Sequence, residues 1–273
     1  MKTKIKDNYT RRGFSLLEIL AVLVVISMLI GLLVPALSTV KKMAANVRQK
    51  AQFTTIEAGL EAFNTDFGDY PDSGRLSGTS ASLILQYCGA QKLAEAMVGL
   101  DGFGFHKDSV FGHDRLDYYG NPIYVTPVDL SKRKGPYLEL EVANAVSLKN
   151  LYPLKSSQLL DDYNSFVLSD KFGLLKNAAT AKKAGKPILY FRANTNKTLL
   201  WEVYNFNDNL SMVQLDGSHP MEAAPDINFF AKITNPNFTV TKRPYRAESF
   251  ILMSAGADGL YGTADDVFNF DTE

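Results

Sequence analysis

The chain has 273 residues, of which 46% are hydrophobic and 21% are charged. This balance is ordinary for a folded protein and excludes a chain that is disordered throughout. The 29 basic and 29 acidic residues cancel, but residues 1–13 hold five basic residues and one acidic residue, so the remainder is mildly acidic. Because no basic stripe follows, we expect no nucleic acid partner.

An apolar run follows the basic residues directly, and it reads FSLLEILAVLVVISMLIGLLVPAL over residues 14–37. As a helix it would be about 36 Å long, which is enough to cross a hydrocarbon core of about 30 Å. The basic flank predicts that the N-terminus stays in the cytoplasm and that the rest is exported. A cleaved signal peptide would carry its small-residue cleavage site after the run, whereas Gly13 precedes it. An uncleaved signal anchor remains an alternative.

Glu18 lies one helical turn inside this run. A carboxylate within a bilayer costs about 2.5–3.5 kcal/mol on insertion scales, so such residues usually have a partner and a function. A simple anchor gives no reason for it. Cleavage before Phe14 would create a new amino group, and among parallel helices the amine of a neighbouring chain is a suitable counter-ion. The pattern therefore predicts assembly through this helix.

Residues 11–18, RRGFSLLE, resemble the type IV prepilin signature, in which basic residues, a glycine and a phenylalanine precede a glutamate at the fifth mature position. The resemblance implies that residues 1–13 are a leader peptide. It implies cleavage after Gly13 and N-methylation of Phe14 by the prepilin peptidase. It also implies that Glu18 contacts the amino terminus of an adjacent subunit, and that an inner-membrane platform assembles the filament.

The helical period continues beyond the apolar run, through residues 38–70. Pro35 lies between the two parts, and it is either a simple kink at the membrane surface or a segment that melts or stretches as a filament forms. We expect one long helix on a head formed by residues 71–273, in an α+β pilin-like fold with a small antiparallel sheet. The expected buried stripe is Phe53, Ile56, Leu60, Phe63 and Phe67, opposed by Gln52, Glu57, Glu61 and Asn64.

Two further segments are similar to the major, G-type pseudopilins of type II secretion systems: residues 60–71, LEAFNTDFGDYP, and residues 117–125, DYYGNPIYV. The second reads as a turn that leads into a strand, although the family usually has tryptophan where Tyr119 stands. Short helices are expected within residues 79–100 and a loop over 101–114. Residues 126–245 have no counterpart in compact pseudopilins and are called the insert below. Within it we expect strands at 137–142, 188–192 and 199–204, and a helix or turn around 174–184.

Residues 254–268 follow a predicted strand at 248–253, and they hold Asp258, Asp265 and Asp266 between glycine-rich turns, with no Lys or Arg after Arg246. Carboxylates brought together repel one another unless they are protonated or bridged by a cation. Oxygen ligands at irregular spacing suit calcium. The segment is similar to the C-terminal calcium loop of major pseudopilins, which implies that these three aspartates are calcium ligands. A solvated acidic tail is the alternative.

No catalytic motif accompanies these features, and the three histidines stand apart without zinc-site spacing, so we expect no enzyme. Cys88 is the only cysteine and excludes an intramolecular disulfide. The resemblance predicts a calcium-stabilised filament subunit that polymerises with itself and with other pseudopilins. It would be anchored in the bacterial inner membrane with a periplasmic head, in a type II secretion system or a type IV pilus. A glycan-binding module displayed by the insert stays open, because its turns at 194–197 and 205–209 are rich in Asn and Asp.

Overall fold

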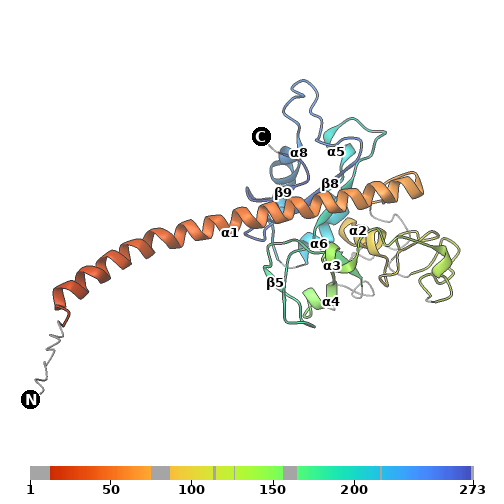
Figure 1. Cartoon of the computed structure of the whole chain (residues 1–273). Coiled ribbons are helices and arrows are strands. Elements are labelled where there is room, and N and C mark those ends of the chain that lie inside the picture. The colour runs from red at the N-terminus through yellow and green to blue at the C-terminus, as the bar shows by residue number, and fades with distance from the viewer. Residues whose placement is uncertain are drawn as a thin grey trace, which may run out of the picture. The chain divides into compact units, whose positions relative to one another are not determined.

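The computed structural model describes residues 13–271 except 75–86, 113–114, 126, 156–164 and 216. The chain divides into two compact units, Met1–Ala44 and Ala45–Glu273, and each is described by itself. Helix α1, Leu16–Phe67, contributes residues to both units (Figure 1). It ends at Gly68, which has a φ of 80° and whose amide donates to the Asn64 carbonyl at 2.7 Å. The predicted single long helix is confirmed.

In the first unit, the described part of α1 is apolar and exposed. The helix is long and apolar enough to cross a membrane. Pro35 does not interrupt it, although proline cannot donate the hydrogen bond of a helix interior. The hydroxyls of Ser38 and Thr39 donate to the Pro35 carbonyl at 2.7 and 3.3 Å, so this carbonyl is hydrogen-bonded by two side chains of the following turn.

In the second unit, α1 buries one face against the head. Four of the five predicted stripe residues are buried, namely Phe53, Ile56, Leu60 and Phe63, and Phe67 is half-buried. The placement of Gln52 on the polar face was wrong, because this side chain is buried. Its amide donates to the carbonyls of Ala143 and Ser169 at 3.2 and 3.0 Å, and these bonds make the burial of a polar group tolerable.

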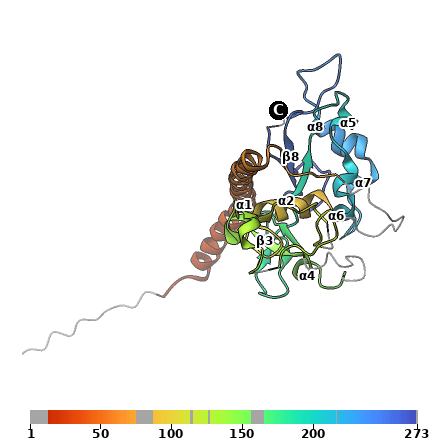
Figure 2. The ribbon, with the colours of Figure 1, turned by 90° about the vertical axis from the view of Figure 1, so that its right-hand side faces the viewer.

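The main sheet is antiparallel and has the order β7–β8–β9, with strands at Leu189–Arg192, Phe250–Ser254 and Val267–Phe268. Phe191 pairs with Ile251, and Met253 pairs with Phe268. Alternate side chains enter two hydrophobic clusters, so both faces of the sheet are buried. One face packs on α1 and α2, and the other packs on helices of the insert (Figure 2). The predicted strands at 188–192 and 248–253 are confirmed.

The outer edge of β7 is closed by side chains from other segments. The Asn209 side-chain amide donates to the Tyr190 carbonyl at 2.7 Å, and the Arg192 amide donates to the Ser73 hydroxyl at 2.8 Å. Helix α2 begins against the same edge, because a Cβ on Gly89 would lie 2.2 Å from the Tyr190 carbonyl oxygen. The Tyr190 carbonyl and the Arg192 amide are therefore already bonded within the subunit.

Short elements complete the head and support an α+β fold. Three two-stranded antiparallel sheets are present among the described residues. The first pairs β1, Phe105–His106, with β2, Arg133–Lys134, and the second pairs β3, Ala145–Ser147, with β4, Phe166–Leu168. The third pairs β5, Leu175–Lys176, with β6, Lys183–Ala184. The α-helices are α2 Gly89–Val98, α3 Leu140–Ala143, α4 Leu148–Leu151, α5 Leu200–Val203, α6 Leu210–Gln214, α7 Pro220–Ala223 and α8 Ala231–Ile233. The 3-10 helices are η1 Leu130–Lys132 and η4 Phe206–Asn209, and η5, Asp226–Phe230, is a π-helix.

Several sequence expectations for short segments were wrong. The predicted strands at 137–142 and 199–204 instead contain α3 and α5. Helix α5 buries Leu200 and Val203, a spacing that suits a helical turn as well as it suits a short strand. Residues 117–125 form the expected turn, in which the Asp117 carboxylate accepts from the Tyr119 amide at 2.8 Å, but they form an isolated bridge rather than a strand.

Three expectations had mixed outcomes. A helix within residues 79–100 is confirmed by α2, with Tyr87, Leu93 and Met97 buried, whereas residues 79–86 lie outside the described residues. The loop at 101–114 contains β1. The segment around 174–184 is the β5–β6 hairpin, with a turn at 178–180.

Candidate functional site

The first candidate site is the start of α1. Gly13 and Phe14 precede the helix and are exposed. Glu18 lies in the first turn, where its amide donates to the Ser15 carbonyl at 3.1 Å. Across the part of the chain that the structure describes, no basic side chain forms an ion pair with the Glu18 carboxylate.

The second candidate site is the loop between β8 and β9, which carries the three predicted calcium ligands. One Asp265 oxygen accepts from the Asp258 amide at 2.8 Å, and the other accepts from the Thr263 hydroxyl at 2.6 Å. The Asp266 carboxylate accepts from the Gly262 amide at 3.0 Å. Hydrogen bonds from the loop itself therefore hold two of the aspartates in place.

Asp266 also has a basic partner, which the sequence analysis missed. The Lys232 ammonium, from α8, lies 2.6 Å from Asp266 Oδ2, and the Asp266 side chain is only 1% exposed. Burial raises the pKa of Asp266 to about 7, and Lys232 opposes that shift. Lys232 lies 34 positions upstream of Asp266, so the absence of Lys and Arg after Arg246 did not indicate this pairing.

The placement of these side chains does not fit a calcium site. Among the described residues, no group of three or more His, Cys, Asp and Glu side chains is arranged to hold a metal ion. Calcium needs six to eight oxygen ligands directed at one point. Asp266 faces an ammonium, and both Asp265 oxygens accept bonds within the loop. Calcium binding at Asp258, Asp265 and Asp266 stays a prediction from the sequence.

A third candidate site is a cleft of about 470 Å³ in the head, at which the two Asn- and Asp-rich turns of the insert meet. Trp201 on α5 is 62% exposed at this cleft. Segments 72–74, 192–196, 201–203 and residues 205 and 208 line it, and the lining includes Asp72, Ser73, Arg192, Asn194, Asn196 and Asn205. An exposed indole ring beside several amides and carboxylates is a surface that recognises polar ligands with an apolar face.

Asp208 forms part of the cleft lining and is 4% exposed. Its Oδ2 accepts from the Ser73 hydroxyl at 2.6 Å, whereas its buried Oδ1 has no hydrogen-bond partner among the described residues. Burial raises the pKa of this carboxyl to about 6. A buried acceptor without a donor is unfavourable and is a candidate for a ligand hydroxyl or amine.

Comparison with known proteins finds a match for the amino-terminal segment. Residues 9–34 match the family described as "Prokaryotic N-terminal methylation motif". In this segment the chain is similar to type IV pilin-like proteins. It is 32% identical over 68 residues to the type II secretion system core protein G of Pectobacterium carotovorum subsp. carotovorum, a match over 25% of this chain and 44% of that protein. The pilin-like chain thus spans less than half the length of this relative. No solved structure matches it significantly.

The matched region of the pilin-like chain contains Gly13, Phe14 and Glu18, the residues singled out from the sequence. The family match extends to residue 34 and so stops just before Pro35. It covers neither the cleft nor the loop at 254–268. The family match therefore carries no information on those two sites.

Proposed function

We propose that the chain is a structural filament subunit of a type II secretion or type IV pilus machine. In this proposal it is processed after Gly13 and assembled through α1. The observation that carries the proposal is an exposed apolar helix that begins with the methylation motif and holds Glu18 in its first turn. Such a helix needs a membrane or other helices around it.

The proposal assigns the partners and the location. The prepilin peptidase removes residues 1–13 and methylates Phe14, and an inner-membrane platform incorporates the subunit beside copies of itself and other pseudopilins. The N-terminus is cytoplasmic and the head is periplasmic, in accord with the basic residues before the apolar run. The protein acts by assembly and is not an enzyme.

Electron microscopy of filaments sheared from the producing cells, with mass spectrometry of their subunits, tests the proposal. We expect this chain among the filament subunits, and we expect it to remain in the inner membrane when the prepilin peptidase gene is deleted. Filaments that lack this chain under conditions in which it is expressed would argue against the proposal. Their position, periplasmic or extending from the cell surface, separates a secretion filament from a pilus.

The mature protein is expected to begin at a methylated Phe14. Intact-mass analysis of the membrane-extracted protein should give the mass of residues 14–273 plus one methyl group. Gly13→Val should prevent this processing, because a branched side chain occupies the cleavage position. Gly31→Val is the matched control, since an added Cβ meets nothing within 4 Å at either glycine. A wild-type mass that retains residues 1–13 in cells with active peptidase would refute the assignment.

A second candidate function, in a different class, is ligand binding at the Trp201 cleft, and we propose it for polyhydroxylated ligands such as glycans. The observation that favours it is that two polar turns and an exposed tryptophan line one cleft together with Asp208, whose Oδ1 has no hydrogen-bond partner among the described residues. Sugar hydroxyls donate and accept hydrogen bonds, and a sugar ring has an apolar face that stacks on an indole. This function is compatible with a filament subunit.

Trp201 is the only tryptophan, so its fluorescence reports on the cleft directly. Saturable changes are expected on titration with a sugar selected from a glycan array. Asn194→Ala should weaken binding by roughly tenfold, which corresponds to about one hydrogen bond. Asn237→Ala is the matched control, because Asn237 is an exposed residue of the insert that does not line the cleft. Equal affinities of the two variants, or a glycan array without specific ligands, would refute ligand binding at the cleft.

A further inference from the structure

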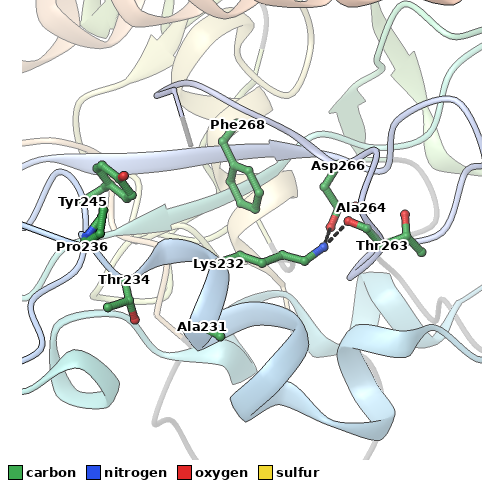
Figure 3. Close-up of a pocket in the computed structure, with 9 residues that line it drawn as sticks. All are labelled: Ala231, Lys232, Thr234, Pro236, Tyr245, Thr263, Ala264, Asp266 and Phe268. Atoms are coloured by element: carbon green, nitrogen blue, oxygen red, sulfur yellow. Dashed lines mark hydrogen bonds and ion pairs between the residues drawn. The ribbon is translucent and has the colours of Figure 1, made fainter. Parts of the chain in front are cut away.

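Lys232 projects from α8 into the loop between β8 and β9, beside a cavity of about 340 Å³ (Figure 3). Its ammonium donates to Asp266 Oδ2 at 2.6 Å and to the Thr263 carbonyl. These acceptors are a carboxylate and a backbone carbonyl, the same oxygen types that hard cations bind in protein loops. A single ammonium thus connects two parts of the loop that lie three residues apart.

The positive charge of the ammonium compensates the negative charge of the buried Asp266 carboxylate. The Asp266 side chain is 1% exposed, and a carboxylate at such a position requires a nearby positive charge or a proton. The Lys232 side chain is 23% exposed, so its ammonium is also partly removed from water. An ion pair in this setting is weakly screened by solvent.

Further contacts from the insert hold the loop at its middle. The Tyr261 amide donates to His219 Nδ1 at 3.1 Å, and the Met221 amide donates to the Tyr261 carbonyl at 3.0 Å. The Tyr261 hydroxyl donates to the Pro187 carbonyl at 2.6 Å. Gly262, with a φ of 95°, lies so close to Met221 that an added Cβ would be 2.4 Å from its backbone nitrogen. The insert therefore contacts the loop through backbone, ring and charged groups.

We propose that Lys232 is the resident cation of this loop, and that the insert closes the loop at 254–268 without a divalent metal. The head is then stable whether or not calcium is present. This differs from the calcium prediction made from the sequence, and the two ideas give opposite results in one measurement. The inference does not depend on filament assembly, because it concerns the isolated subunit.

Thermal unfolding of the full chain in detergent, with millimolar calcium, millimolar magnesium or a chelator, tests the proposal. The wild-type midpoint is expected to be the same in all three conditions. Lys232→Met should lower the midpoint by roughly 6–20 °C, because it leaves a buried carboxylate without its partner. Lys242→Met is the matched control, because Lys242 is an exposed lysine of the same insert. It should leave the midpoint unchanged.

Two additional variants keep the test decisive if Lys232→Met does not fold. Lys232→Arg retains the charge and should unfold closer to the wild type than Lys232→Met does. The double variant Lys232→Met with Asp266→Asn removes both charges and should recover part of the loss. A wild-type midpoint that rises with calcium but not with magnesium overturns the proposal and restores the calcium site. A Lys232→Met midpoint equal to that of Lys242→Met overturns it as well.

Discussion

Replacing Glu18 with alanine is expected to abolish filament formation while leaving membrane insertion intact. The carboxylate opposes insertion by about 2.5–3.5 kcal/mol, so its removal should not hinder the entry of α1 into the bilayer. Assembly should fail, because the variant cannot pair with the amino group of a neighbouring Phe14. Within the described residues of the chain, no basic side chain forms an ion pair with this carboxylate.

The measurement is the amount of subunit in sheared filaments relative to the amount in the membrane fraction. Glu18→Gln removes the negative charge but keeps a polar side chain. Because the prediction rests on an ion pair, this variant should also fail to form filaments. Ser27→Ala serves as the control in the same helix, because the Ser27 hydroxyl donates to the Leu23 carbonyl of its own helix at 2.7 Å. A normal filament yield from Glu18→Ala would show that the carboxylate has no role in pairing.

Phe191→Ala is expected to destabilise the whole head by about 3–5 kcal/mol, the usual cost of removing a large buried aromatic side chain. Phe191 belongs to the insert and is fully buried, with its ring centroid 4.7 Å from that of Phe229. Its cluster also contains Ile251 and Phe268, which lie outside the insert. One shared core therefore predicts one cooperative transition that shifts as a unit.

Calorimetry of the full chain in detergent should show this as a drop in midpoint of roughly 6–20 °C with a single transition. Phe238→Ala provides the control, since Phe238 is a 43% exposed residue of the insert, and it should cost about 1 kcal/mol or less. Two separate transitions, of which only one responds to Phe191→Ala, would mean that the insert folds as an independent module.

The sequence predicted the elements that a long or strong local pattern specifies. Helix α1 has a helical period over its buried stripe, and the strands β7 and β8 are runs of large apolar residues. The four-residue helices α3 and α5 were predicted as strands, because so few positions do not distinguish a helical period from a strand period. The burial of Gln52 was missed because its partners, the carbonyls of Ala143 and Ser169, lie about a hundred positions away.

The candidate sites also divide into those specified by neighbouring residues and those formed by tertiary packing. The processing and assembly residues Gly13, Phe14 and Glu18 are neighbours in the sequence and lie inside the matched methylation motif, so a local pattern was enough to single them out. Their roles stay predictions, as does that of Pro35. The loop at 254–268 was predicted only in its acidic half. Its basic half, Lys232, is brought to Asp266 by the packing of α8 beside the loop, and no local pattern indicates that pairing. The burial of Asp208 Oδ1 without a hydrogen-bond partner among the described residues is likewise a result of tertiary packing.

The closed outer edge of β7 has a consequence for how neighbouring subunits meet. A pool of unassembled subunits in one membrane would place many heads at high local concentration, a condition under which open sheet edges join into aggregates. At β7 the Tyr190 carbonyl is bonded to Asn209 and the Arg192 amide is bonded to Ser73. A strand from a second head would have to displace both bonds before it could add to this edge. In the proposed filament subunit, these two bonds therefore oppose fusion of unassembled heads through β7.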